Sequence, residues 1–80
     1  MLEIIFRILS DHAQYQEKIS LNTSLIDDLG IDSLSIFSIA ADIEKEYNIE
    51  ISPSEINYEN FNCPKSILEL INRKNNEKHH

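Results

Sequence analysis

The chain has 80 residues, of which 41% are hydrophobic and 26% charged, and its formal net charge is −7 at pH 7. A chain this short forms one small domain with little room for a deep catalytic cleft. The acidic balance disfavours nucleic acid and anionic membranes as partners and favours basic protein surfaces.

The N-terminal part of the chain is predicted to form one helix followed by a long loop. A helix at about residues 2–16 follows from apolar residues at steps of three and four. These residues are Leu2, Ile5, Phe6, Leu9 and Ala13. The next stretch has no sustained period, and a loop of this length in a compact domain is usually functional. The apolar residues expected to hold it on the core are Ile19, Leu21, Leu25 and Leu29.

The strongest periodic segment is predicted to be a helix from Ser33 to about Tyr47. Asp32 is expected to be the N-cap, because its side-chain carboxylate can accept the unpaired amides of the first turn. Asn48 is expected to end the helix. The apolar stripe consists of Ile36, Ile39, Ala40, Ile43 and Tyr47.

The C-terminal part is predicted to contain two more helices. The capping box at residues 52–55, with Pro53 at the first helical position, predicts a short third helix of about six residues. Cys63-Pro64 likewise places a small residue at the N-cap and proline at the first position of the last helix. The inward face of that helix would carry Ile67, Leu68 and Ile71. The polar tail from Asn72 is expected to fray.

We therefore predict an all-α four-helix bundle with a long loop between helices one and two and a short third helix. Residues 1–75 would form one domain, followed by a polar tail at residues 76–80. His79-His80 resembles the remnant of a purification tag and is set aside. The single cysteine is typical of a reducing compartment. With no signal-peptide pattern and no membrane-spanning run, we expect a cytoplasmic protein without membrane insertion.

Ser33 is the first candidate site residue. As the first helical residue it would hold its hydroxyl in solvent, where unpaired amides and the helix dipole favour a phosphodiester. Gly30 would allow the chain to turn into the helix. Serine and aspartate also simply start helices well, and position alone favours that simpler interpretation.

Leu34, Phe37 and Ala41 follow the spacing i, i+3, i+7 and lie on one face beside Ser33. Since the core stripe does not need them, they are candidates for an exposed docking surface. They could equally contact the short third helix, and both roles can hold together.

Other chemistry is disfavoured. The carboxylates of the loop and helix two are Asp27, Asp28, Asp32, Asp42, Glu44 and Glu46, and such a cluster is usually a solvated face. A calcium loop starting at Asp28 would place Ile39 where glutamate is needed, so we expect no metal site. A triad of His12, Ser33 and an aspartate lacks a nucleophile elbow, and Cys63 lacks an activating histidine.

The stretch "NTSLIDDLGIDSLSIFSIAADIEKEYNIEIS" closely resembles the signature region of acyl carrier proteins and of the related peptidyl and D-alanyl carriers. In that family the serine of Asp-Ser-Leu is esterified with 4′-phosphopantetheine. The resemblance implies that Ser33 is the attachment site, with Asp32 and Leu34 as its motif neighbours. Residues 28–30 match the lead-in to the motif, and the resemblance covers nearly the whole chain.

The resemblance also implies a non-enzymatic, monomeric carrier of acyl or aminoacyl thioesters. Its partners would be a phosphopantetheinyl transferase that uses coenzyme A, an acyl- or aminoacyl-activating ligase, and synthases or transferases with basic or apolar docking patches. The pathway could be fatty-acid, polyketide or nonribosomal-peptide biosynthesis, or D-alanyl transfer. The docking residues would be Leu34, Phe37, Ala41, Asp28 and Glu44.

Departures from the family pattern favour a stand-alone carrier of a specialised pathway over the fatty-acid role. Ser35 and Ser38 stand where fatty-acid carriers typically have carboxylates, Phe37 where a smaller aliphatic is common and Ala41 where a methionine often is. A fatty acyl cargo could fold back among the helices. Its candidate lining is Ile39, Ile43, Ile56 and Phe61. The alternatives are an unmodified acidic interaction module of the same fold and an enzyme that uses Ser33 or Cys63 directly.

Overall fold

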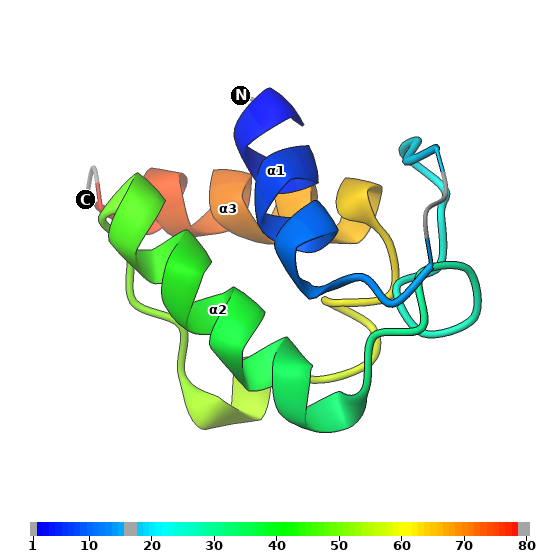
Figure 1. Cartoon of the computed structure of the whole chain (residues 1–80). Coiled ribbons are helices and arrows are strands. Elements are labelled where there is room, and N and C mark those ends of the chain that lie inside the picture. The colour runs from blue at the N-terminus through cyan, green and yellow to red at the C-terminus, as the bar shows by residue number, and fades with distance from the viewer. Residues whose placement is uncertain (1, 16–17, 79–80) are drawn as a thin grey trace.

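The computed structural model describes residues 2–15 and 18–78, and all regular structure among them is helical. It contains three α-helices, α1 Leu2–His12, α2 Ser33–Tyr47 and α3 Pro64–Lys78, and one 3₁₀ turn, Pro53–Glu55. Helix α1 contacts both α2 and α3, and Figure 1 shows it crossing α3 with α2 beside it. The all-α class is confirmed. A four-helix bundle is not, because the described residues form three α-helices.

Apolar side chains from all three α-helices meet in one core. Its buried members are Ile5, Ile8, Leu9, Leu25, Leu29, Ile31, Ile36, Ile39, Ala40, Ile43, Ile49, Ile51, Phe61, Ile67, Leu70 and Ile71. In the predicted stripe of α2, Ile36, Ile39, Ala40 and Ile43 are buried, and Tyr47 packs against the core half-buried. In α1 and α3 the face is turned slightly from the expected one, so that Phe6 and Leu68 are only half-buried.

Helix α1 ends at His12 and not at about residue 16. The reason is a contact distant in sequence: the amides of Gln14 and Tyr15 donate to the carbonyl of Leu29 at 2.8 and 3.3 Å instead of continuing the helix. Ala13 still packs against the core, from outside the helix.

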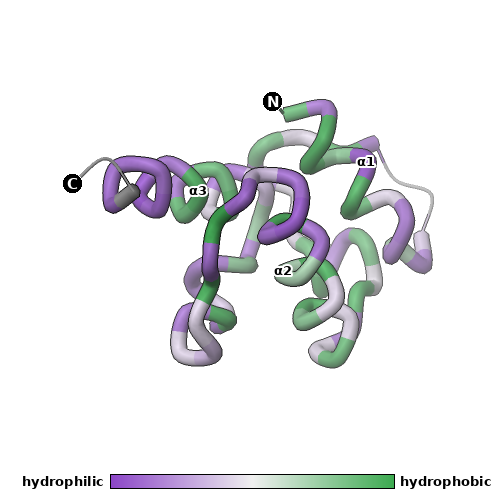
Figure 2. Tube along the Cα trace, turned by 90° about the vertical axis from the view of Figure 1, so that its left-hand side faces the viewer, coloured by the Kyte–Doolittle hydropathy of each residue, from purple (hydrophilic) through white to green (hydrophobic). Residues whose placement is uncertain are grey.

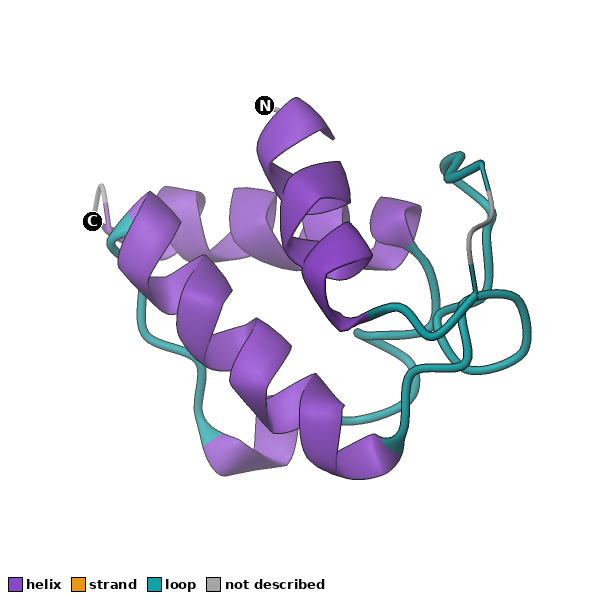
Figure 3. Ribbon diagram, viewed as in Figure 1, coloured by secondary structure: helices purple, strands orange, loops and turns teal. Residues whose placement is uncertain are grey.

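The connection between α1 and α2 is fastened to the start of α3, and Figure 3 shows its described part beside the helices. The amide of Leu25 donates to the carbonyl of Asn62 at 3.0 Å, and that of Lys65 donates to the carbonyl of Leu21 at 3.1 Å. Leu25 and Leu29 are fully buried, as predicted. Leu21 is 40% exposed, so the prediction for its side chain is wrong: its backbone makes the contact.

Helix α2 begins and ends where the sequence predicts. The carboxylate of Asp32 accepts the amide of Ser35 at 2.8 Å, which satisfies one of the unpaired donors of the first turn. At the other end Asn48 adopts a left-handed conformation with φ 52°, and its amide donates to the carbonyl of Glu44.

The predicted third helix is reduced to the 3₁₀ turn Pro53–Glu55. The capping box is present, and the Ser52 amide donates to the Glu55 carboxylate at 2.9 Å. The helix does not extend because asparagine side chains bind the carbonyls that it would need. Asn57 Nδ2 donates to Ser54 O at 3.0 Å, and Asn60 Nδ2 donates to Glu55 O at 2.8 Å.

Helix α3 continues to Lys78, so the fraying expected from Asn72 onward is wrong for the described residues. Figure 2 shows this end of α3 as hydrophilic, and it holds its place through polar contacts. Lys74 Nζ lies 2.6 Å from the carboxylate of Glu55, and Arg73 donates to the side chain of Asn60 at 3.0 Å. No helix in the described part of the chain is long and apolar enough to cross a membrane.

Candidate functional site at the start of α2

Ser33 is the first residue of α2 and is exposed to solvent. Within the described chain no hydrogen bond occupies its hydroxyl, and no acidic residue lies in the first turn of the helix. The neighbouring Asp32 carboxylate points back to Ser35. The Ser35 amide first, and the Ser35 hydroxyl second, hold the pKa of Asp32 below its usual value. The cap is therefore ionised at neutral pH while the serine hydroxyl stays free.

The approach to Ser33 is fixed by Gly30. This glycine has φ 67°, a conformation that other residues adopt at a cost. A Cβ at this position would lie 2.8 Å from Cε2 of Tyr15 and 3.2 Å from Cβ of Gln14. The role predicted for Gly30 is confirmed, and the close approach of the Tyr15 ring adds a second reason for glycine.

An apolar hollow of about 160 Å³ opens beside Ser33. Its floor is formed by buried residues, Ile36 and Phe61, and its rim by exposed ones. The complete lining is Ile26, Ser33, Ile36, Phe37, Ile56, Asn57, Tyr58 and Phe61. Ser33 therefore stands at the edge of a concave apolar surface between α2 and the segment that follows the 3₁₀ turn.

Exposed apolar side chains surround the serine, as predicted for two of them. Leu34 is 78% exposed and Phe37 is 54% exposed, and Ala41 is exposed as well. The sequence argument missed Ile26 and Tyr58, which are 42% and 59% exposed and also line the hollow. Each had a signal in the sequence: Tyr58 lies in a polar stretch, and Ile26 directly follows Leu25, which is predicted to be buried.

Two of the four residues proposed to line an acyl site belong to the core instead. Ile39 and Ile43 are fully buried in the core and do not line the hollow. Ile36, one turn nearer to Ser33, takes their place. Ile56 and Phe61 do line it.

The two acidic residues predicted to contact partners, Asp28 and Glu44, differ in exposure to solvent. Asp28 is exposed, and its carboxylate accepts the amide of Ser24 at 2.8 Å. Glu44 is half-buried, and its carboxylate accepts the amide of Ile51 at 2.9 Å. Both carboxylates thus stabilise local backbone, and only Asp28 is well placed at the surface near the start of α2.

The candidate catalytic groups do not converge. His12 lies 3.3 Å from the carboxylate of Asp42, and neither residue lines the hollow beside Ser33. The Cys63 thiol lies 3.4 Å from the hydroxyl of Ser66 at the start of α3. No cluster of three metal-binding side chains occurs among the residues that the structure describes.

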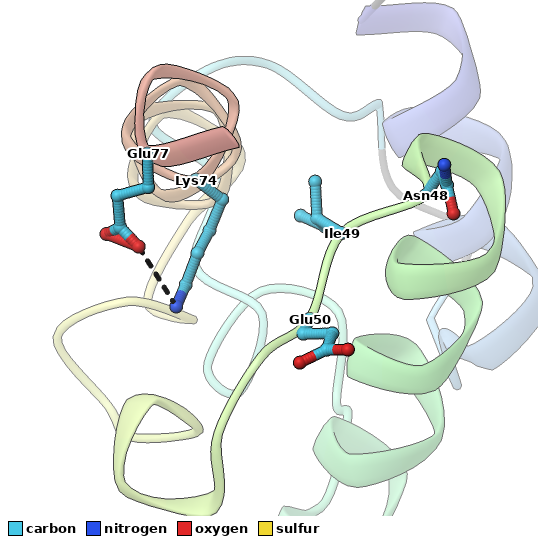
Figure 4. A pocket seen from close by; sticks show the side chains of 5 residues that line it. All are labelled: Asn48, Ile49, Glu50, Lys74 and Glu77. Atoms are coloured by element: carbon cyan, nitrogen blue, oxygen red, sulfur yellow. Dashed lines mark ion pairs between the residues drawn. The ribbon is translucent and has the colours of Figure 1, made fainter. Parts of the chain in front are cut away.

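A second hollow, of about 430 Å³, lies at the other end of α2 (Figure 4). It is lined by Asn48, Ile49, Glu50, Lys74 and Glu77. Lys74 lies 3.7 Å from Glu77 and 2.6 Å from Glu55. The Glu55 carboxylate is the main cause that raises the pKa of Lys74, so this cation is held by protein carboxylates.

The start of α2 fits a phosphodiester-linked arm. It offers an unbonded, exposed hydroxyl at the positive end of a 15-residue helix, and the carboxylate of the N-cap Asp32 is turned to the Ser35 amide. Ser33 would hold the group covalently, and the apolar hollow beside it can receive an apolar substituent.

Comparisons with known proteins agree with this geometry. A family model described as "Phosphopantetheine attachment site" matches residues 3–71. The acyl carrier protein of Buchnera aphidicola subsp. Acyrthosiphon pisum (strain Tuc7) is 41% identical over 63 residues, which is 79% of this chain and 76% of the relative. That of Buchnera aphidicola subsp. Schizaphis graminum (strain Sg) is 42% identical over 59 residues, 74% of this chain and 72% of the relative. The chain therefore belongs to the acyl carrier protein family: it is a non-enzymatic carrier of acyl groups whose prosthetic group is 4′-phosphopantetheine.

Proposed function

We propose that Ser33 is the residue to which 4′-phosphopantetheine is attached, with Asp32 and Leu34 as its motif neighbours. The observation that carries this proposal is the exposed, unbonded hydroxyl at the first position of α2, beside an apolar hollow. Attachment joins Ser33 Oγ to the phosphate of the arm, releases adenosine 3′,5′-bisphosphate from coenzyme A and passes the hydroxyl proton to solvent or to the transferase. The bound group supplies a thiol that carries the acyl group as a thioester.

The local geometry supports this assignment over a purely structural role for the serine. Asp32 already caps the helix through the Ser35 amide, so the Ser33 hydroxyl is not needed for that purpose. Three other serines lie close by, and each differs from Ser33. Ser35 is half-buried and bonded to Asp32, Ser38 lies a turn further along α2, and Ser24 bonds the amide of Asp27.

The direct test is intact mass after incubation with coenzyme A, magnesium and a promiscuous phosphopantetheinyl transferase. The unchanged chain should gain one phosphopantetheine, and Ser33→Ala should gain none. Ser38→Ala is the matched control, because it removes an exposed hydroxyl from the same helix and should be labelled fully. Label on Ser33→Ala would contradict the assignment, and so would failure of the unchanged chain with its cognate transferase. The second result would favour an unmodified interaction module.

An acyl carrier interacts with synthases and transferases, and we propose which surface of this chain they contact. The surface consists of Leu34, Phe37 and Ala41 on α2, with Asp28 at its edge. Its support is the exposure of Leu34 and Phe37, at 78% and 54%, and the net charge of −7. Partners with an apolar patch bordered by basic residues fit it. Glu44 is the weakest member, because its carboxylate is bonded to Ile51.

The partners that we propose are a phosphopantetheinyl transferase, an acyl- or aminoacyl-activating ligase, and the synthases or transferases that take the cargo from a monomeric carrier. Ser35 and Ser38, where fatty-acid carriers typically have carboxylates, support a stand-alone carrier of a specialised pathway. The free cysteine Cys63 supports a cytoplasmic location. We propose residues 1–75 as the carrier domain, although α3 continues beyond them to Lys78.

A further inference from the structure

Tyr15 is an exposed aromatic side chain beside the segment that leads into Ser33. Six large apolar side chains of the described chain are 40% exposed or more. Four of them line the hollow beside Ser33 or follow that serine directly, namely Ile26, Leu34, Phe37 and Tyr58. Tyr15, which is 55% exposed, is one of the two that remain, and it lies outside the docking surface of α2.

The position of Tyr15 is fixed by the segment that it accompanies. Its amide and that of Gln14 both donate to the carbonyl of Leu29, at 3.3 and 2.8 Å. Its ring lies against Gly30, where a Cβ would be 2.8 Å from Cε2 and 3.1 Å from Cδ2 of the ring. One edge of the ring is therefore covered by the backbone of this segment, while more than half of the residue stays open to solvent.

The segment between the ring and Ser33 is held by backbone hydrogen bonds. The amide of Gly30 donates to the carbonyl of Ile26 at 3.2 Å, and that of Ile31 donates to the carbonyl of Leu25 at 3.0 Å. The next residue is the N-cap of α2, whose carboxylate accepts an amide of the first turn. The ring therefore keeps a fixed place relative to the serine.

The exposed part of Tyr15 has both an apolar and a polar group to offer. Its hydroxyl makes no hydrogen bond to another described residue. Tyrosine combines a large apolar ring with a polar end, and it is enriched among the residues that contribute most to binding at protein interfaces. Tyr15 thus presents an apolar contact and one hydrogen-bond donor to a visiting protein.

The partner that must cover this part of the surface is the one that modifies Ser33. Partners that act on the thioester meet it at the far end of the arm, whereas the transferase brings the phosphate of coenzyme A to Ser33 Oγ itself. An interface of standard size covers about 800 Å² of each protein, which is a disc of about 16 Å radius. Three residues of extended chain span at most about 11 Å, so such a disc centred on Ser33 reaches Gly30 and the ring that lies against it.

Resting on the attachment of the arm at Ser33, we propose that Tyr15 is a docking residue for the phosphopantetheinyl transferase. Its ring packs on an apolar side chain of that enzyme, and its hydroxyl donates to a main-chain carbonyl or a carboxylate there. The surface that the transferase contacts thus extends from α2 to the residues that follow α1. This additional part serves the attachment step.

The first test measures steady-state kinetics of a phosphopantetheinyl transferase that labels the unchanged chain. Tyr15→Ala should raise KM for the carrier about tenfold, with kcat within about twofold. Tyr15→Phe should raise KM about threefold, because only the hydroxyl is lost. Leu21→Ala removes an exposed apolar side chain from the loop and should leave KM unchanged. An unchanged KM in Tyr15→Ala would overturn the proposal.

A second measurement separates docking from a role that acts only through Gly30. Hydroxyl-radical footprinting of Ser33→Ala, which keeps the docking surface but cannot accept the arm, compares side-chain oxidation with and without the transferase. Oxidation of Tyr15 and Leu34 should fall several-fold, and that of Leu21, whose backbone is bonded to the start of α3, should not change. A raised KM without protection of Tyr15 would mean that the ring only supports the segment, and would overturn the proposal. Because the footprint uses the natural tyrosine, it decides even if a Tyr15 variant does not fold.

Intact mass of the products separates this proposal from the attachment itself. Label on Ser33→Ala, or none on the unchanged chain, would overturn the attachment and this inference with it. A single adduct on Ser33, with unchanged kinetics in Tyr15→Ala and no protection of Tyr15, would overturn the inference alone.

Discussion

The two ends of α2 differ in how their side chains are satisfied. At its end, around Asn48–Ile51, most residues that line the hollow are polar, and its lysine, Lys74, lies 2.6 Å from Glu55 and 3.7 Å from Glu77. At its start the hollow is apolar, the serine hydroxyl has no partner among the described residues, and Leu34 is 78% exposed. The ion pairs and hydrogen bonds at the C-terminal end of α2 are explained by their contribution to stability alone. The exposed apolar groups at the other end are not explained by stability, and they agree with the proposed attachment at Ser33 and the proposed docking surface.

The largest effect on stability is expected from a substitution at Gly30, in the segment that leads into Ser33. Gly30→Ala should lower the free energy of unfolding by about 2 kcal/mol, because alanine disfavours φ 67° and its Cβ meets the ring of Tyr15. Gly30→Asn should cost less, since asparagine tolerates this conformation. Urea unfolding measures both. If Gly30→Ala in a Tyr15→Ala background costs as much as before, the contact with the ring has no part in the effect.

A smaller effect, confined to partner binding, is expected at the exposed apolar surface. Leu34→Ala should reduce kcat/KM of the phosphopantetheinyl transferase about tenfold, or about 1.4 kcal/mol, while the free energy of unfolding changes by less than about 0.5 kcal/mol. Leu21→Ala also removes an exposed leucine, 40% accessible, but from the loop. It should leave kcat/KM unchanged. Equal losses in both variants would mean that the transferase does not distinguish the two surfaces.

The smallest effect is expected at the ion-paired end. Lys74→Ala should cost about 0.5–1 kcal/mol of stability at neutral pH, since its side chain and that of Glu55 are 16% and 27% accessible. Lys65→Ala, which has no ion pair in the described chain, is the control and should cost less. Transferase activity should be the same in both variants. A large loss of transferase activity in Lys74→Ala would contradict the view that this end of α2 contributes only to stability.

The same ion pair predicts a pH window. Lys74 is the main cause that lowers the pKa of Glu55 from 4.5, and Glu55 is the main cause that raises the pKa of Lys74 from 10.5. The stabilisation is therefore complete between these two values. It is lost as pH falls from 4.5 through the lowered pKa of Glu55, or rises from 10.5 through the raised pKa of Lys74. The stability difference between the unchanged chain and Lys74→Ala should shrink at both extremes.

The sequence predicts features that depend on neighbouring residues and fails where distant contacts decide. Helix α2 was predicted with its caps because Asp32 and Asn48 act within a few residues of their partners. Helix α1 ends early because the carbonyl of Leu29 binds the amides of residues 14 and 15, and no local pattern shows this. Helix α3 runs on because Lys74 meets Glu55, again a contact between distant segments.

The 3₁₀ turn is a different kind of error, because its cause is local. The capping box at residues 52–55 correctly predicts a helical start, but Asn57 and Asn60 bind the carbonyls of the first turn. Two asparagines shortly after a capping box were the available signal. At the candidate site, the exposure of Leu34 and Phe37 was predicted from their spacing. The hollow was predicted only in part, because its lining depends on how the connection 48–63 passes over α2.

The backbone bonds that fasten the long connection to residues 62 and 65 have a consequence for the order of events during synthesis. The segment that leads into Ser33 is fastened by residues that leave the ribosome about forty positions after it. Translation adds only about 5–20 residues each second. A nascent chain that ends before α3 contains the serine and its motif but not the packed approach to it. The serine therefore reaches its final surroundings only after α3 has been made, so a transferase that recognises the folded surface acts after translation.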